Sequence, residues 1–119
     1  MTQPKPSYSR GEVVLVLFPH SDLRTAKTHP ALVIQADQLN TGLPQTIVAM
    51  ITGNLSRAGH PSRVLVARNG AIGHGAGLLA DSLVMADNLA TVAETAIDRA
   101  IGMLPMAEVD EALRRTLEL

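Results

Sequence analysis

The sequence predicts a mainly β domain, a small antiparallel barrel with one C-terminal helix packed on it. Short apolar runs rich in β-branched residues recur between positions 12 and 104, with turn residues between them, which is typical of strands. The final stretch carries apolar side chains at helical spacing instead. A chain of 119 residues, 46% hydrophobic and 18% charged, suits one domain with its own core. We therefore expect a single domain over residues 10–119 after a loose tail at residues 1–9.

Three apolar runs in the first half predict strands. They are residues 12–18 (EVVLVLF), 31–35 (ALVIQ) and 46–52 (TIVAMIT). The third run is apolar at both alternating sets of positions, so we expect a central strand that is buried on both faces. The polar stretch 19–30 is predicted to be a twelve-residue loop, and connections of that length are often functional.

The second half predicts shorter elements. A polar loop at residues 53–62 is followed by the glycine-rich stretch 70–77, which we expect to be mobile or tightly turned. The strands expected here are 63–67, 77–79, 82–86 and 89–92, with a turn at 93–97 and a strand or helix entry at 100–104.

The C-terminus predicts the clearest helix. Pro105 suits the first helical position, because the N–H that proline lacks would be unpaired there. One face of this helix is apolar: Met106, Val109, Leu113 and Leu117. The other face is charged, and Glu111 and Arg115 stand four residues apart in the favourable order.

Composition excludes several classes of protein. Cysteine is absent, so disulfides, thiol nucleophiles and thiolate metal sites are excluded. The four histidines fit no zinc-ligand spacing, so we expect no metal and no cofactor. No apolar run approaches the ~20 residues that span a membrane, and the N-terminus lacks the apolar stretch of a signal peptide. These observations favour a cytoplasmic protein.

Charge is distributed unevenly along the chain. Residues 1–70 carry seven Lys and Arg against three Asp and Glu, whereas residues 71–119 carry three against eight. One interpretation is a basic binding half and an acidic outer half. The other is chance combined with a solvated acidic helix.

Several stretches, in order along the chain, resemble the MazF/PemK family of bacterial toxins. Residues 10–16 (RGEVVLV) are similar to the opening strand of that family, and residues 29–34 (HPALVI) and 46–52 to its next two. Residues 81–92 (DSLVMADNLATV) resemble its "DSVV…D/EQ-x-R-T" stretch, and residues 101–104 with the final helix resemble its ending. No single stretch is specific, but the ordered set is.

The resemblance implies an SH3-like antiparallel barrel of the MazF/CcdB type that forms a homodimer. It also implies a toxin of a type II toxin–antitoxin module, which cleaves single-stranded RNA at specific sequences without metal and is neutralised by a MazE-like antitoxin peptide. In the family, an arginine before a proline and a Thr or Ser at the end of the third strand carry much of the chemistry. Thr52 matches the second position, but His29 stands in place of the arginine, and Ala90 in place of the arginine of "D/EQ-x-R-T".

RNA cleavage without metal needs a base for the 2′-hydroxyl, a donor for the phosphorane charge and an acid for the leaving oxygen. His29 suits the acid or base role, because histidine titrates near neutral pH. Arg24 or Lys27, in the same predicted loop, would supply positive charge, and Thr52 would hydrogen-bond the scissile phosphate. We take His29, Thr52 and Arg24 as the candidate catalytic residues.

The candidate RNA-binding residues are Lys27, Asn54, Ser56, Arg57 and Asp87. Turn formation explains Asn54 and Ser56 equally well, and Asp87 could instead cap a turn. Only 2% of the residues are aromatic, so base stacking on rings would contribute little.

Three functions remain open at this point. The first is an RNA-cleaving toxin. The second is a catalytically weakened relative that acts by protein binding, either to its antitoxin or to DNA gyrase, as CcdB does. The third is a barrel adaptor without a toxin role. Segments near Met85 and Met103 could supply a dimer face or belong to the core.

Overall fold

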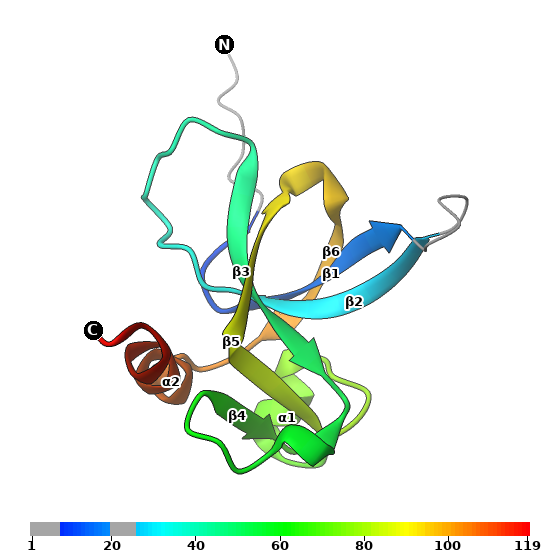
Figure 1. Cartoon of the computed structure of the whole chain (residues 1–119). Coiled ribbons are helices and arrows are strands. Elements are labelled where there is room, and N and C mark those ends of the chain that lie inside the picture. The colour runs from blue at the N-terminus through cyan, green and yellow to red at the C-terminus, as the bar shows by residue number, and fades with distance from the viewer. Residues whose placement is uncertain (1–7, 20–25) are drawn as a thin grey trace.

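The structure is a computed structural model that describes residues 8–19 and 26–119, and these form one curled antiparallel sheet with helices at one end (Figure 1). The strands are β1 (Glu12–Pro19), β2 (Ala26–Val33), β3 (Gln45–Thr52), β4 (Arg63–Val66), β5 (Ser82–Ala93) and β6 (Ile97–Met103). The helices are α1 (Ala71–Ala76), α2 (Ala107–Leu117) and the 3-10 turns η1 (Leu55–Arg57) and η2 (Glu94–Ala96). The predicted mainly β fold with a C-terminal helix is confirmed.

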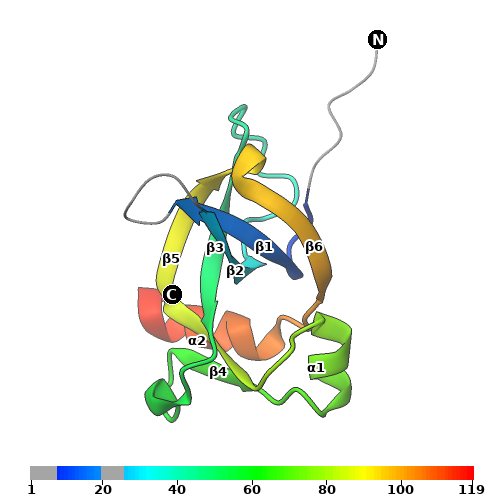
Figure 2. The ribbon, with the colours of Figure 1, turned by 90° about the vertical axis from the view of Figure 1, so that its right-hand side faces the viewer.

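The sheet has the order β4-β5-β3-β2-β1-β6, and every neighbouring pair is antiparallel. It is barrel-like but does not close, because β4 and β6 remain its two edges. Figure 2 shows both α-helices at the lower end of the curled sheet, where β4 also lies.

Apolar side chains lie on both faces of the central strands and form two clusters. The helix-side core consists of Val13, Leu32, Ala49, Ile51, Val66, Ala76, Leu78, Val84, Ala86, Leu104, Val109, Ala112 and Leu113. The barrel core consists of Val14, Val16, Ala31, Val33, Val48, Val92 and Ile97. Successive residues of β3, such as Val48 and Ala49, alternate between the two clusters. The prediction that residues 46–52 form a central strand buried on both faces is therefore confirmed.

The predicted loop 19–30 is wrong over much of its length. Strand β2 begins at Ala26, so Lys27 and His29 lie on a strand and pair with β1, His29 opposite Val16. Polar composition suggested a loop, but the long antiparallel partner satisfies the backbone hydrogen bonds whatever the side chains are. The candidate histidine therefore has a fixed place in the sheet.

The glycine-rich stretch 70–77 forms the helix α1, and the strand predicted at 77–79 is absent from the described structure. Gly77 ends the helix in the left-handed conformation, with φ 73°. A Cβ on Gly73 would overlap the carbonyl of Ala67 just after β4. The glycines therefore let this short helix pack directly on backbone, which the sequence pattern did not indicate.

The two strands predicted at 82–86 and 89–92 are one bent strand, β5. Its register against β3 runs from Ala49 opposite Leu89 to Met50 opposite Met85. The strand β3 advances by one residue there and β5 by four, so residues 86–88 form a bulge. The bulge ends at Asn88, which lies beside His29 of β2 in a shallow depression.

The helix α2 begins after Met106, slightly later than predicted, and buries Val109, Ala112 and Leu113 against the helix-side core. Leu117, expected on the same face, is half exposed. Met85 is buried in the sheet, whereas Met103 is exposed. Within residues 8–19 and 26–119, the helices are too short or too polar to cross a bilayer.

Candidate functional site

His29 lies beside a shallow depression at the margin of the barrel core. His29 and Ala31 stand two residues apart on β2, so their side chains leave the same face of the strand, and Ala31 belongs to that core. The depression has a volume of about 310 Å³ and is lined by His29, Met50, Asn88 and Ala90. Three strands, β2, β3 and β5, thus contribute residues to this depression.

Thr52 leaves the same face of the sheet as His29. Along β3 it follows Met50 by two residues, and Met50 packs against the barrel core. Ala31 pairs with Met50, so the same register continued by two residues would bring His29 opposite Thr52. The pairing of β2 with β3 ends at Ala31, next to Pro30, which has no N–H to donate.

The end of β3 is held by a chain of local hydrogen bonds. Thr52 Oγ1 accepts from the Asn54 N–H at 3.1 Å. Asn54 Oδ1 accepts from the Ser56 N–H at 3.2 Å and from its hydroxyl at 2.7 Å, and so caps η1. The hydroxyl proton of Thr52 is still a donor, because the bond from Asn54 uses only a lone pair of its oxygen.

Two arginines and Asp87 form a second network where β4 and β5 meet. Arg63 Nη2 donates to Asp87 Oδ2 at 2.8 Å, and Arg63 Nη1 donates to the Arg57 carbonyl at 3.2 Å. Arg57 Nη1 lies 3.6 Å from the sulfur of Met85. The hydrogen bond from Arg63 lowers the pKa of Asp87 below its usual 3.8.

Arg63 is the member of this network that sequence analysis missed. Its side chain is about three-quarters buried, with 25% exposed. The available signal was an arginine at the start of an apolar strand, where a charged side chain needs a partner. The partner, Asp87, is 24 positions away in the sequence, and only the β4–β5 pairing brings the two together.

The other basic candidates are less defined. Lys27 is exposed and two residues before His29 on β2, hence on the same face of the strand. Arg24 lies outside the described residues.

The two charge halves of the sequence interleave in space. Arg10 pairs with Asp110 and Arg63 with Asp87, and each pair joins a base from the first half to an acid from the second. The interpretation of a basic half set apart from an acidic half is therefore wrong at these points. Within residues 8–19 and 26–119, no group of three Asp, Glu or His side chains is placed to hold a metal ion.

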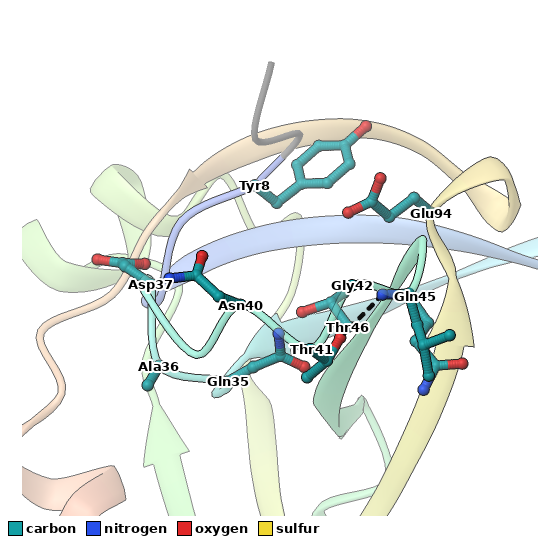
Figure 3. Close-up of a pocket in the computed structure, with 11 residues that line it drawn as sticks. Tyr8, Gln35, Ala36, Asp37, Asn40, Thr41, Gly42, Gln45, Thr46 and Glu94 are labelled. Carbon is teal, nitrogen blue, oxygen red and sulfur yellow. Dashed lines mark hydrogen bonds between the residues drawn. The ribbon is translucent and has the colours of Figure 1, made fainter. Parts of the chain in front are cut away.

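Two other hollows lie away from the candidate residues. A polar hollow of about 150 Å³ lies under the β2–β3 loop, with Tyr8 and Glu94 on its far side (Figure 3). Thr41 in its wall accepts a hydrogen bond from the Leu43 N–H at 3.2 Å, and Asp37 accepts one from the Arg10 N–H at 2.6 Å. These two side chains therefore hold the backbone in and beside the loop. An apolar groove of about 550 Å³ runs between β4, α1 and the start of α2.

Comparison with known proteins identifies relatives over nearly the whole chain. Residues 9–118 match the family described as "PemK-like, MazF-like toxin of type II toxin-antitoxin system". The chain is 35% identical over 116 residues to "Endoribonuclease MazF6" of Mycobacterium tuberculosis and to "Endoribonuclease MazF2" of Mycobacterium bovis. Each alignment covers 93% of this chain and 97% of the relative.

Solved structures share the fold at lower identity. The Mycobacterium tuberculosis toxin MazF-mt6 superimposes with a TM-score of 0.69 at 23% identity, covering 91% of this chain and 97% of that one. A MazE–MazF crystal structure from Deinococcus radiodurans gives a TM-score of 0.68 at 15% identity, covering 93% of each chain. The match to the family and the 35% identity to its curated relatives establish that this chain belongs to the PemK-like, MazF-like toxins of type II toxin–antitoxin systems.

Proposed function

We propose that this protein is the toxin of a type II toxin–antitoxin module, a sequence-specific endoribonuclease that cleaves single-stranded RNA without metal. The observation that carries the proposal is the 35% identity, over 93% of the chain, to relatives named endoribonucleases. The placement of His29 and Thr52 on one face of the sheet supports it, because cleavage needs a proton-transferring group and a phosphate donor on one surface.

The reaction uses a nucleophile that the substrate itself provides. The ribose 2′-oxygen attacks the adjacent phosphorus, its proton passes to a base, and the bond from phosphorus to the 5′-oxygen breaks. The 5′-oxygen takes up a proton, so the products are a 2′,3′-cyclic phosphate and a 5′-hydroxyl. No water is consumed in this step, and side chains can carry both proton transfers.

His29 takes one of the two proton-transfer roles. Imidazole changes its charge between pH 5 and 8, so it serves as base in one protonation state and as acid in the other. His29 lines the depression together with Met50, Asn88 and Ala90. Arginine, which the family has here, stays charged and cannot be the base, so His29 gives this chain a titratable group at that place.

Thr52 donates its hydroxyl proton to a phosphate oxygen, because the hydrogen bond that it accepts from the Asn54 N–H leaves this proton available. We assign RNA binding to Lys27, Asn54, Ser56 and Arg57, and Arg24 would supply further positive charge to the catalytic group. Phosphate contacts from such residues set position, and amide and hydroxyl groups read unpaired base edges. Asp87 is the remaining candidate RNA-binding residue.

The partners proposed are single-stranded RNA, a second copy of this chain and a MazE-like antitoxin peptide, all in the cytoplasm. The shared fold supports the antitoxin assignment, because solved structures with it include a mycobacterial endoribonuclease in complex with its cognate antitoxin and the MazE–MazF complex. The exposed Met103 adds apolar surface for association.

The alternative, a weakened relative that acts only by protein binding or on gyrase, is not favoured. Its basis was the pair of missing arginines, at His29 and Ala90. The named endoribonucleases among the relatives outweigh that basis, and histidine can perform acid–base chemistry itself.

The decisive experiment incubates the purified chain with a long RNA in excess EDTA and maps the 5′-hydroxyl ends. We expect cuts at one short recurrent sequence. An oligonucleotide with that sequence is then tested with a single 2′-deoxy nucleotide at the cut position, and it should remain intact. Cleavage of the deoxy substrate would refute the 2′-hydroxyl mechanism. Absence of any RNA cleavage, together with inhibition of gyrase supercoiling, would establish the alternative.

A further inference from the structure

The Arg63–Asp87 pair joins β4 to two segments that carry candidate RNA-binding residues, the 53–62 loop and the bulge of β5. The bulge of β5 begins directly after Met85, the last β5 residue that pairs with β4. The N–H of Ala86 donates to the Ser62 carbonyl at 2.8 Å, so the bulge is bonded to the end of the 53–62 loop. Asp87 is the middle residue of the bulge, and its carboxylate meets Arg63 at 2.8 Å.

The guanidinium of Arg63 joins this bulge to the loop that bears Arg57. One terminal nitrogen binds Asp87, and the other donates to the Arg57 carbonyl. The loop is tightened further by His60, whose Nδ1 accepts from the Ser62 N–H at 3.1 Å and lies 2.7 Å from the Ser62 hydroxyl. The Arg63 side chain thus fixes the spacing between η1 and β5.

The residue after Asp87 is Asn88, which lines the depression beside His29. Asp87 is thus paired with Arg63 of β4, whereas Asn88 lies beside His29 of β2 and Met50 of β3. The residue next to His29 in the depression therefore directly follows a residue that is ion-paired with β4.

The pair is arranged in a way that stability alone does not favour. Arg63 Nε is buried and has no hydrogen-bond partner among the described residues. A buried unpaired donor costs free energy, and an ion pair between side chains that remain 25% and 31% exposed gains little net stability. Such a pair fixes the relative positions of the groups that it joins more than it stabilises the fold, because two hydrogen bonds hold both terminal nitrogens of a rigid planar guanidinium.

We propose that Arg63 and Asp87 act together as a positioning pair, which sets Asn88 and Arg57 for RNA binding without either charge contacting RNA. This rests on the proposed function and deepens it. A carboxylate at the RNA surface would repel phosphate, but in the pair its charge is balanced by Arg63. Direct contact of Asp87 with a base amino group would require its bond to Arg63 to be shared or broken.

A double-mutant cycle tests the pair. Arg63→Met, Asp87→Asn and the double variant are compared with wild type for kcat and KM on a short RNA that contains the mapped cut site. Because both residues act through one contact, we expect each single change to raise KM about tenfold and the double change to do no more harm than the worse single one. Effects that multiply in the double variant would overturn the proposal and make Asp87 an independent RNA contact.

The control is Arg99→Met, which removes an exposed ion pair with Asp98 on β6 and should leave kcat and KM unchanged. All values are taken at a temperature where thermal unfolding shows each variant folded. If Arg63→Met does not fold, two other variants test the positioning role. They are Asp87→Asn, which is nearly identical in size to wild type, and the exchange Arg63→Asp with Asp87→Arg. Recovery of KM in the exchanged pair supports positioning, and a folded exchanged pair with unrecovered KM contradicts it.

Failure of this inference is distinguishable from failure of the proposed function. If the wild-type chain cuts no RNA, the proposed function fails first. If wild type cuts RNA and the singles retain the wild-type KM, only the positioning role is refuted.

Discussion

Arg10 Nη2 lies 2.6 Å from Asp110 Oδ1, so the residue that opens the first strand region is joined to the C-terminal helix a hundred positions later. Arg10 Nε also donates to the Ile34 carbonyl at 2.9 Å, just after β2. One guanidinium thus holds the start of β1, the end of β2 and α2 together. The family-like Arg-Gly-Glu opening has a structural reason in this chain.

Removing this clamp should lower stability without touching the chemistry. We expect Arg10→Met to reduce the free energy of unfolding by about 1–3 kcal/mol, because charge-assisted hydrogen bonds are lost and Asp110 keeps a half-buried charge. Urea unfolding at fixed protein concentration measures this. Arg114→Met, which removes an exposed pair with Glu111, is the matched control and should change stability by less than about 0.5 kcal/mol. Equal effects of the two variants would disprove the clamp.

Replacing His29 with Ala should abolish RNA cutting. Loss of a general acid or base typically slows a reaction by about 10²–10⁴-fold. Single-turnover cleavage of the mapped RNA measures the rate, and circular dichroism checks the fold. His74→Ala, an exposed histidine in α1, is the control and should cut at the wild-type rate. Wild-type cutting by the His29 variant would remove the imidazole from the mechanism.

Thr52 is tested by comparing Ala with Ser. The Ala variant lacks both the donor to phosphate and the acceptor for the Asn54 N–H, and we expect its rate to fall by about 10²–10³-fold. The Ser variant keeps the hydroxyl and should retain most activity. Mapping of 5′-hydroxyl ends gives both results. If Ser fails as completely as Ala while both remain folded, the hydroxyl is not the functional group.

Asp87 should make stability depend on pH in the acidic range. Arg63 lowers the pKa of Asp87 in the folded chain below 3.8, so the folded state binds that proton less readily than the unfolded state. The contribution is therefore complete above pH 3.8 and is lost as pH falls through the lowered pKa. We expect the stability difference between wild type and Asp87→Asn to shrink across this interval in acid titrations followed by circular dichroism. A difference that is constant with pH would contradict the lowered pKa.

The packing of α1 predicts opposite effects for two glycines of one helix. A Cβ at position 73 would overlap the Ala67 carbonyl, so Gly73→Ala should destabilise the fold by about 1–3 kcal/mol. A Cβ at Gly75 would lie 3.8 Å from the Met103 carbonyl oxygen, an ordinary contact. Gly75→Ala should therefore gain about 0.5–1 kcal/mol from the better helix propensity of alanine. Thermal denaturation distinguishes the two, and similar shifts would refute the close approach.

Local pattern was sufficient to predict much of the fold. The apolar run 46–52 was predicted as a strand buried on both faces, and its residues do alternate between the two cores. The helix at the C-terminus and the family also follow from the chain itself. Such features can be predicted because strand and helix periodicities are complete within a short window of sequence.

The remaining features required the folded chain. His29 lies on a strand because β1 pairs with it, and α1 forms because Gly73 can approach Ala67. The bulge in β5 and the contact of Arg63 with Asp87 depend on register between separate strands.

The sequence by itself thus determined the buried central strand at 46–52, the helix at the C-terminus and the family that the chain resembles. Only the tertiary structure decided which charges meet and which side chains share the depression with His29. The physical reason is that strand register and long-range ion pairs are set by packing of the whole sheet, and residues far apart in the chain carry no periodic signal of their partners.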